Sequence, residues 1–370
     1  MKSKKIISMI LAVAAALSLC LPAFAASSLE DQVLAEVTSL YDNDYDISDT
    51  NAQIVSSTEN EDGSTTYLVD ATFKRTLKEA SASDMPYIQG LKDAAAELTD
   101  PAEIAAAENY IAIWTAELEG NYIGVAQDTN VTLSVTIPQG ISTRSAYTVA
   151  PTDIQVYDDM TNNGFPLESI QPKSDAALRE EAQETIAQVA GNANMQQMSN
   201  YAALSPIQYY NRITARNYAR TWSCSGGYSY DHKSCHNPDY DFYAGSDCAN
   251  FVSQCIHEGG LEKDDAWYPY SSPWTTTGNS GWGLRQYLTG TGYFFHSNNV
   301  YDAFAGSVIN FLNSDGSNMG HVGLIDQNDT QTITFCAHTS CRHSHTIPDY
   351  NRDFYVPIWD SYTGSWTVRH

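Results

Sequence analysis

The sequence is poor in basic residues. Lysine and arginine together number 19 in 370 residues, against 44 aspartates and glutamates, and the formal net charge is −25. A chain with this excess of negative charge repels the phosphates of nucleic acids and of anionic membranes. The composition therefore argues against a nucleic-acid partner.

Several motifs are absent from the sequence. Beyond the first 25 residues it contains no second long apolar run, no glycine-rich nucleotide-binding motif and no internal repeat. These absences argue against a membrane-spanning protein, a nucleotide-dependent enzyme and a repeat architecture, and no cofactor is expected. Hydrophobic residues nevertheless make up 42% of the chain, which is enough to bury ordinary cores, so we expect a folded, soluble, acidic protein.

Residues 1–25 have the pattern of a secretory signal peptide. A basic start is followed by an apolar stretch from Ile6 to Leu21 and by the small-x-small cleavage pattern of Ala23-Phe24-Ala25. The apolar stretch, about 16 residues, is shorter than the roughly 20 that a transmembrane helix needs. We therefore expect a protein that is secreted to the extracellular space or the cell wall, without a membrane anchor after cleavage.

Six cysteines remain after such a cleavage: Cys224, Cys235, Cys248, Cys255, Cys336 and Cys341. A secretory route permits disulfides. The spacing of Cys224 and Cys235, and that of Cys336 and Cys341, each allows a local bridge, although sequence alone does not fix the pairing. If both bridges form, Cys248 and Cys255 are left as thiols.

The composition divides the chain into an N-terminal and a C-terminal part. Apolar residues alternate from Tyr67 to Phe73 and from Val131 to Ile137, which predicts half-buried strands, and Asp100-Pro101 predicts the start of a helix over Ala102 to Glu119. We expect an α+β accessory domain over residues 26–170, a helical or flexible connector over 171–204, and a further domain over 205–370. All nine histidines, the six cysteines and all but one of the seven tryptophans lie in that last part, so the chemistry is expected there.

Cys248 is the first candidate for chemistry. Cys248, Phe251, Val252, Cys255 and Ile256 follow helical spacing, with Ser246 or Asp247 placed to cap the helix. Cys248 then lies in the first turn, where free N–H groups favour a thiolate and can also stabilise an oxyanion. Two turns further on, Cys255 is expected to be a buried apolar residue.

A nucleophilic cysteine needs a base, and two histidines qualify. Gly320 to Ile325 reads as one strand and Thr332 to Thr339 as the next, with a turn at Gln327 to Thr330 between them. The pairing that follows from this turn places His321 and His338 on one face as direct or diagonal neighbours, close enough for a hydrogen bond. The sequence thus predicts a Cys/His/His constellation.

These motifs, in this order, resemble the putative amidase domain of secreted bacterial proteins, which is similar to the NlpC/P60 and CHAP cysteine hydrolases. The resemblance spans about residues 205–350 and is carried by Tyr210-Asn211-Arg212, Asp247-Cys248-Ala249-Asn250-Phe251-Val252-Ser253-Gln254, Gly306 to Phe311, Gly320-His321-Val322-Gly323-Leu324-Ile325 and Ala337-His338-Thr339. It implies an α+β fold class, with a papain-like C-terminal domain in which a helix bearing the cysteine packs on an antiparallel sheet. It also implies Cys248 as nucleophile, His321 as general base and His338 as the residue that orients the base. Ala249 and Ser307 depart from the threonine and aspartate that the family pattern leads us to expect.

The resulting hypothesis is a secreted cysteine-dependent amide hydrolase that acts on peptidoglycan peptide or amide bonds. Five aromatic residues are candidates for the cleft, although packing is their default role: Trp267, Tyr268, Tyr270, Trp274 and Trp282. The alternatives are a cysteine peptidase or small-amide hydrolase with a non-wall substrate, and a wall-binding protein without catalysis. A zinc site is a further alternative, with either Cys224, His232, Cys235 and His236, or Cys336, His338, Cys341, His343 and His345 as ligands. Our expectation is that no metal is bound; the oligomeric state is not decided by the sequence.

Overall fold

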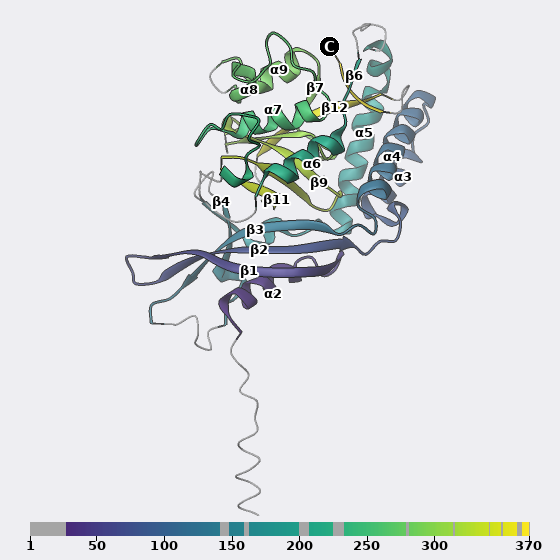
Figure 1. Cartoon of the computed structure of the whole chain (residues 1–370). Coiled ribbons are helices and arrows are strands. Elements are labelled where there is room, and N and C mark those ends of the chain that lie inside the picture. The colour runs from purple at the N-terminus through teal and green to yellow at the C-terminus, as the bar shows by residue number, and fades with distance from the viewer. Residues whose placement is uncertain are drawn as a thin grey trace, which may run out of the picture.

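The computed structural model describes residues 27–140, 148–158, 163–199, 207–224, 233–278, 281–313, 315–339, 341–348, 351–360 and 365–369 (Figure 1). The predicted leader lies outside these residues. Within them, no helix is both long and apolar enough to cross a membrane.

The described α-helices are α2 (Leu29–Ser39), α3 (Pro86–Ala95), α4 (Pro101–Asn121), α5 (Asp175–Ser199), α6 (Arg212–Trp222), α7 (Cys248–Glu258), α8 (Ser272–Thr275) and α9 (Leu284–Gly290). The strands are β1 (Tyr45–Glu59), β2 (Thr65–Leu77), β3 (Gln127–Ile137), β4 (Ile154–Asp158), β5 (Asn163–Pro166), β6 (Ile207–Tyr209), β7 (Phe294–Ser297), β8 (Val308–Leu312), β9 (Asn318–Asn328), β10 (Ile333–Ala337), β11 (Arg342–Thr346), β12 (Arg352–Asp360) and β13 (Ser365–Arg369).

The N-terminal half is built on the antiparallel strands β1, β2 and β3, with α2 packed against the first two (Figure 1). The predicted strands lie within β2 and β3, and the predicted helix lies within α4. Asp100 caps α4 because its Oδ1 accepts from the N–H groups of Ala102 at 2.8 Å and Glu103 at 3.2 Å. These three predictions from local patterns are confirmed.

Helix α5 covers most of the segment that we expected to be a helical or flexible connector. It packs against α3 and α4 and buries Leu178, Ala182 and Ile186 in the core of the N-terminal half. The approach to α3 is close: a Cβ added to Gly90 would lie 2.8 Å from the Cβ of Ala182. The helix is therefore part of a packed core.

The C-terminal half contains a mostly antiparallel sheet that is packed on both faces. Strands β8, β9 and β10 pair in antiparallel order, and α6, α7, α8 and α9 lie on one side of them (Figure 1). One hydrophobic cluster joins these helices to Val308, Val322 and Leu324. A second cluster, which includes Ile309 and Phe335, occupies the other face. The helix that carries Cys248 thus packs on an antiparallel sheet, whereas the papain-like assignment stays a prediction.

The two halves are joined through their backbones and their cores. β3 pairs in parallel with β11 at Asn130 and His345, so the described strands form one hydrogen-bonded network. Tyr301, from the C-terminal half, stacks on Tyr87 with ring centroids 4.0 Å apart, and its carbonyl accepts from Trp114 Nε1 at 3.0 Å. The N-terminal half is therefore in direct contact with the part of the chain that carries the candidate chemistry.

Candidate active site

Cys248 is the first residue of α7, as the helical spacing predicts. Asp247 occupies the N-cap position, but its carboxylate makes no capping hydrogen bond to the helix backbone. Instead, the N–H of Asp247 donates to Thr339 Oγ1 at 2.6 Å, which ties the start of the helix to the residues that follow β10. The sequence offered Ser246 or Asp247 as the cap; Asp247 takes the position, but contacts across the fold replace its side-chain cap.

The thiol of Cys248 is covered, since the residue is only 5% exposed. It donates to the carbonyl oxygen of Gly320 at a distance of 3.8 Å, and its sulfur faces the backbone N–H of Val322. Burial raises the pKa of the thiol to about 11, because removing the sulfur from water disfavours its charged form more than the nearby N–H groups favour it. Burial therefore opposes the lowering of the thiol pKa that the helix start predicts.

The polar residues that follow Cys248 in α7 are buried and bonded. Asn250 donates to the carbonyl of Asp241 and to Asp247 Oδ1, each at 2.8 Å, and its Oδ1 accepts from Trp274 Nε1 at 2.8 Å. Gln254 Oε1 accepts from Tyr218 OH at 2.8 Å. These side chains fix α7 against its neighbours, and so fix the position of the nucleophile candidate.

His338 lies on the side of the sheet that faces α7. Its ring stacks on Phe251 with centroids 4.0 Å apart, and Nδ1 lies 2.6 Å from Asp247 Oδ2. Nε2 lies 2.6 Å from the carbonyl oxygen of Trp222, the last residue of α6. Both nitrogens of His338 are thus engaged, and the ring connects α6, α7 and the end of β10.

The side chain of His321 packs on the other face of the sheet, away from α7 and His338. Its ring is buried and stacks on Phe311, with centroids 5.4 Å apart, and Phe311 belongs to the cluster on the face away from α7. The backbone on both sides of His321 is nevertheless close to Cys248, since the thiol contacts the carbonyl of Gly320 and the N–H of Val322. The structure thus brings the thiol of Cys248 to the strand that carries His321. The imidazole of His321, however, packs on Phe311, on the other face of that strand.

The predicted pairing of His321 with His338 is wrong. The turn lies at residues 329–332, and the register of β9 and β10 shifts between Thr334 and Phe335, after which Cys336 lies opposite Leu324. A shift of one residue moves every later side chain to the other face of a strand. The two imidazoles are therefore placed on opposite faces of the sheet.

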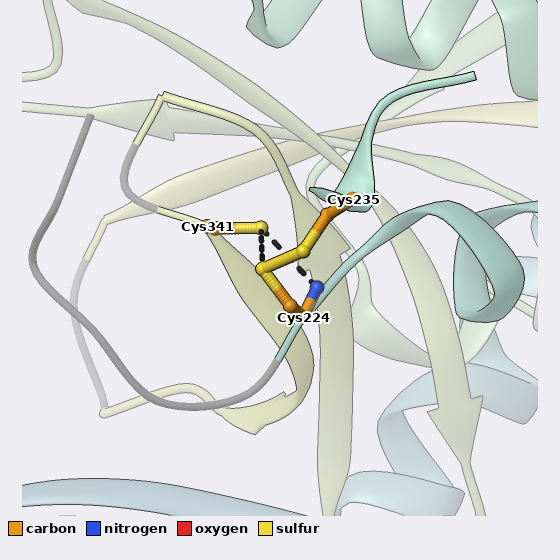
Figure 2. A group of neighbouring side chains, drawn as sticks. All are labelled: Cys224, Cys235 and Cys341. Atoms are coloured by element: carbon orange, nitrogen blue, oxygen red, sulfur yellow. Dashed lines mark hydrogen bonds between the residues drawn. A yellow bond between two sulfur atoms is a disulfide. The ribbon is translucent and has the colours of Figure 1, made fainter. Parts of the chain in front are cut away.

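Of the two disulfides that the cysteine spacing allowed, one is present and the other is not. Cys224 and Cys235 are joined by a disulfide, as their spacing allowed. Cys336 and Cys341 are both free thiols, and Cys341 Sγ lies 3.1 Å from Cys224 Sγ, beside the disulfide (Figure 2). Cys336 is fully buried and its sulfur accepts from the N–H of Ser344. Cys255 is buried as expected.

The five aromatic candidates for the cleft divide into two groups. Trp267 and Trp274 are fully buried in the core around α7 and serve packing. Tyr268, Tyr270 and Trp282 are exposed by 46%, 68% and 53%, so they alone of the five are free to meet a substrate in this conformation.

Neither predicted zinc set comes together within the part of the chain that the structure describes. Cys224 and Cys235 are consumed by their disulfide, and His232 lies outside the described residues. The structure instead places His236 and Asp247 beside His338, with ligand atoms within 4.8 Å of one another. In the sequence, Asp247 was a possible helix cap and the first residue of the motif around Cys248, but it was not among the candidate site residues; the available signal was that it directly precedes the candidate nucleophile.

Residues 209–357 match the family model described as "Putative amidase domain". The match includes Cys248, His321 and His338 and covers less than half of the chain. It identifies an amidase-like segment and so indicates hydrolysis of amide bonds. No curated protein and no solved structure matches the chain. The amidase-like segment thus extends from β6 into β12 and includes all four helices that pack around the candidate nucleophile.

Proposed function

We propose that the protein is a cysteine-dependent amide hydrolase with Cys248 as its nucleophile. One observation carries the proposal: in a segment that matches an amidase family, Cys248 is the first residue of a helix that packs on a central antiparallel strand. A helix start offers free N–H groups to the negative charge that develops on sulfur and then on the substrate oxygen.

The proposed reaction proceeds in two halves. The thiol loses its proton to a base, and the sulfur attacks the carbonyl carbon of the amide. The tetrahedral intermediate collapses as the amine leaves with a proton from the protonated base, which gives a thioester on Cys248. Water then attacks this thioester and returns the free thiol and a carboxylic acid.

We assign the base to His321. Both nitrogens of His338 already face fixed acceptors, so that ring is poorly placed to take a proton from Cys248. His321 follows the carbonyl to which the thiol donates, and it lies where the pairing of β8 with β9 is irregular, next to Gly320 with φ +84°. In the proposal, a local rearrangement of this stretch carries the imidazole to the sulfur, and His338 is a positioning residue for the start of α7.

The substrate that we propose is peptidoglycan, at its stem-peptide bonds or at its sugar-to-peptide amide. The predicted leader supports this choice because it would deliver the enzyme to the compartment of the wall. The exposed Tyr268, Tyr270 and Trp282 lie in the segment between α7 and α9 and are suited to contact with sugar or peptide. A non-wall peptide or a small amide is the alternative.

Trapping the thioester tests the proposed mechanism. The mature protein is incubated with peptidoglycan fragments, denatured in acid and analysed by peptide mass spectrometry. We expect a fragment-sized adduct on Cys248 in the wild type and in Cys255→Ala, which removes the other α7 thiol, and none in Cys248→Ala. In His321→Gln the adduct should be lost, whereas His338→Gln should retain some. An adduct on another residue, or one that persists in Cys248→Ala, contradicts the assignment.

A further inference from the structure

His236, Asp247 and His338 form a compact group of potential metal ligands beside α7. Asp247 Oδ2 is central to it, at 2.6 Å from His338 Nδ1 and 3.6 Å from His236 Nδ1. The side chains of His338 and Asp247 are 2% and 1% exposed, and that of His236 is 13% exposed. The group is therefore almost closed to solvent and is reached from the side of His236.

Both ring nitrogens of His338 face hydrogen-bond acceptors, which a neutral imidazole cannot satisfy. Nδ1 faces a carboxylate and Nε2 faces a backbone carbonyl, and both of these groups are acceptors. A neutral imidazole carries a single N–H. A cation is therefore required between His338 Nδ1 and Asp247, and it is either a second proton or a metal ion.

We propose that this group binds one divalent transition metal of the zinc class. Two imidazole nitrogens and one carboxylate oxygen are a donor set that suits zinc, with a fourth position left for water. With the metal on Nδ1, His338 is neutral and keeps its single proton on Nε2, so both of its observed partners are satisfied. The carboxylate of Asp247 then offsets part of the charge of the metal inside the protein.

The hydrogen bonds around His338 and Asp247 resemble those that orient the ligands in known metal sites. A histidine that binds a metal normally donates its other N–H to a carbonyl or carboxylate, as the Nε2 of His338 is placed to do toward Trp222. The second oxygen of Asp247 is held by the N–H of Tyr243 at 3.0 Å and by Asn250 Nδ2 at 2.8 Å, which leaves Oδ2 for the metal. His338 and Asp247 are thus both oriented by groups that are not themselves metal ligands.

The ligand atoms of the three residues lie within 4.8 Å of one another, and binding of a metal requires them to move. Zinc bound tetrahedrally at about 2.0–2.1 Å places its ligand atoms about 3.3 Å apart. The separation of Asp247 and His236 is close to this value, whereas Asp247 and His338 must move apart by several tenths of an ångström. Cys341, the free thiol nearest the disulfide, belongs to a separate sulfur group and is not needed.

The test is zinc binding by the full mature chain. The protein is stripped with a chelator and dialysed, and Zn²⁺ alone is added, with stoichiometry read by elemental mass spectrometry and affinity by calorimetry. We expect about one zinc per chain with a dissociation constant at or below the micromolar range. Affinity should fall about tenfold or more in His236→Ala, which removes the most exposed ligand. It should be unchanged in His296→Ala, whose half-exposed ring pairs with Asp353 away from the group.

Three results would overturn the proposal: no zinc bound by the folded wild type, equal affinity in His236→Ala, or loss of zinc in Cys341→Ser. The last would assign the metal to the sulfurs. Circular dichroism of every variant checks that it is folded, and absence of zinc from the folded wild type overturns the proposal whatever the variants show. Binding is measured without a substrate, so the outcome is independent of whether the protein hydrolyses amides.

Discussion

Arg212, at the start of α6, and Glu117, in α4, form a buried ion pair with Nη2 and Oε2 2.6 Å apart. The two side chains are only 5% and 4% exposed, and Arg212 also donates to the carbonyl of Ala305 at 2.8 Å. The pair joins the amidase-like segment to the N-terminal half. Together with the pairing of β3 and β11, it indicates that the two halves fold as one unit.

Removing one charge of this pair should destabilise the whole protein. Glu117→Gln leaves the guanidinium of Arg212 buried without its carboxylate, which typically costs about 3–5 kcal/mol. We expect the unfolding midpoint in guanidinium chloride to fall in a single transition seen alike by tryptophan fluorescence and circular dichroism. Glu108→Gln, an exposed residue of the same helix, is the control and should change little. Two separate transitions, with only one of them shifted, would contradict the shared unit.

The amidase-like segment should not be stable alone. Residues 205–370 without the N-terminal half expose the edge of β11 that pairs with β3, and Tyr301 and Phe304, which are buried against the N-terminal core. We expect this fragment to be aggregated or unfolded. The full mature chain, prepared in the same way, is the control and should be folded, as a monomer or as an oligomer of defined size. Sedimentation and circular dichroism check this. A soluble fragment with a cooperative transition would show that the segment is an independent domain.

The disulfide should change partner when Cys235 is removed. Cys341 Sγ lies 3.1 Å from Cys224 Sγ, within reach for a bond after a small shift. In Cys235→Ser, oxidation by glutathione disulfide should join Cys224 to Cys341, with two molecules of glutathione released per bridge. Peptide mapping by mass spectrometry reads the linkage. Cys336 serves as the internal control, since its buried thiol should stay free, and a bridge to Cys336 or between two chains would contradict the geometry.

Alkylation of Cys248 should depend steeply on pH in the free protein. Its thiol pKa is raised to about 11 by burial, so the reactive thiolate fraction should rise about tenfold per pH unit up to about that value. Iodoacetamide labelling of the folded protein, followed by mass spectrometry, gives the rate for this cysteine. Cys255 is fully buried and burial also raises its pKa, so it should stay unlabelled. A rate that is already constant below pH 7 would show a preformed thiolate and would contradict the closed, neutral thiol.

Local patterns predicted the elements, whereas contacts between distant residues decided the site. Spacing allowed both the Cys224–Cys235 bridge, which is formed, and a Cys336–Cys341 bridge, which is not. The strands within β2 and β3, the helix α4 and the start of α7 follow from spacing over a few residues. The turn between β9 and β10 does not. Its Asp329 accepts from the N–H of Thr332 at 2.8 Å and from the hydroxyl of Tyr45, in the N-terminal half, at 2.9 Å.

The sequence did not predict the register of β9 and β10 or the burial of the Cys248 thiol, because contacts between distant residues determine both. The shift between Thr334 and Phe335 has no signature in the alternation of apolar residues, yet it separates His321 from His338. A helix start by itself favours a thiolate, but the depth at which the sheet buries Cys248 is a property of the whole fold. Asp247 likewise gains its partners, His338 and Thr339, only when β10 is placed beside α7.

The most direct test is release of fragments from purified peptidoglycan sacculi by the mature protein and by its Cys248→Ala and Cys255→Ala variants, with a fold check on each. Mass spectrometry of the soluble products identifies any new amine and carboxyl termini, and so the bond that is cut. We expect fragments with new amine and carboxyl termini from the wild type and from Cys255→Ala, and none from Cys248→Ala. Equal release by Cys248→Ala would contradict the assignment of Cys248 as the nucleophile. No release by any folded form, from sacculi of several wall chemistries, would contradict the peptidoglycan substrate.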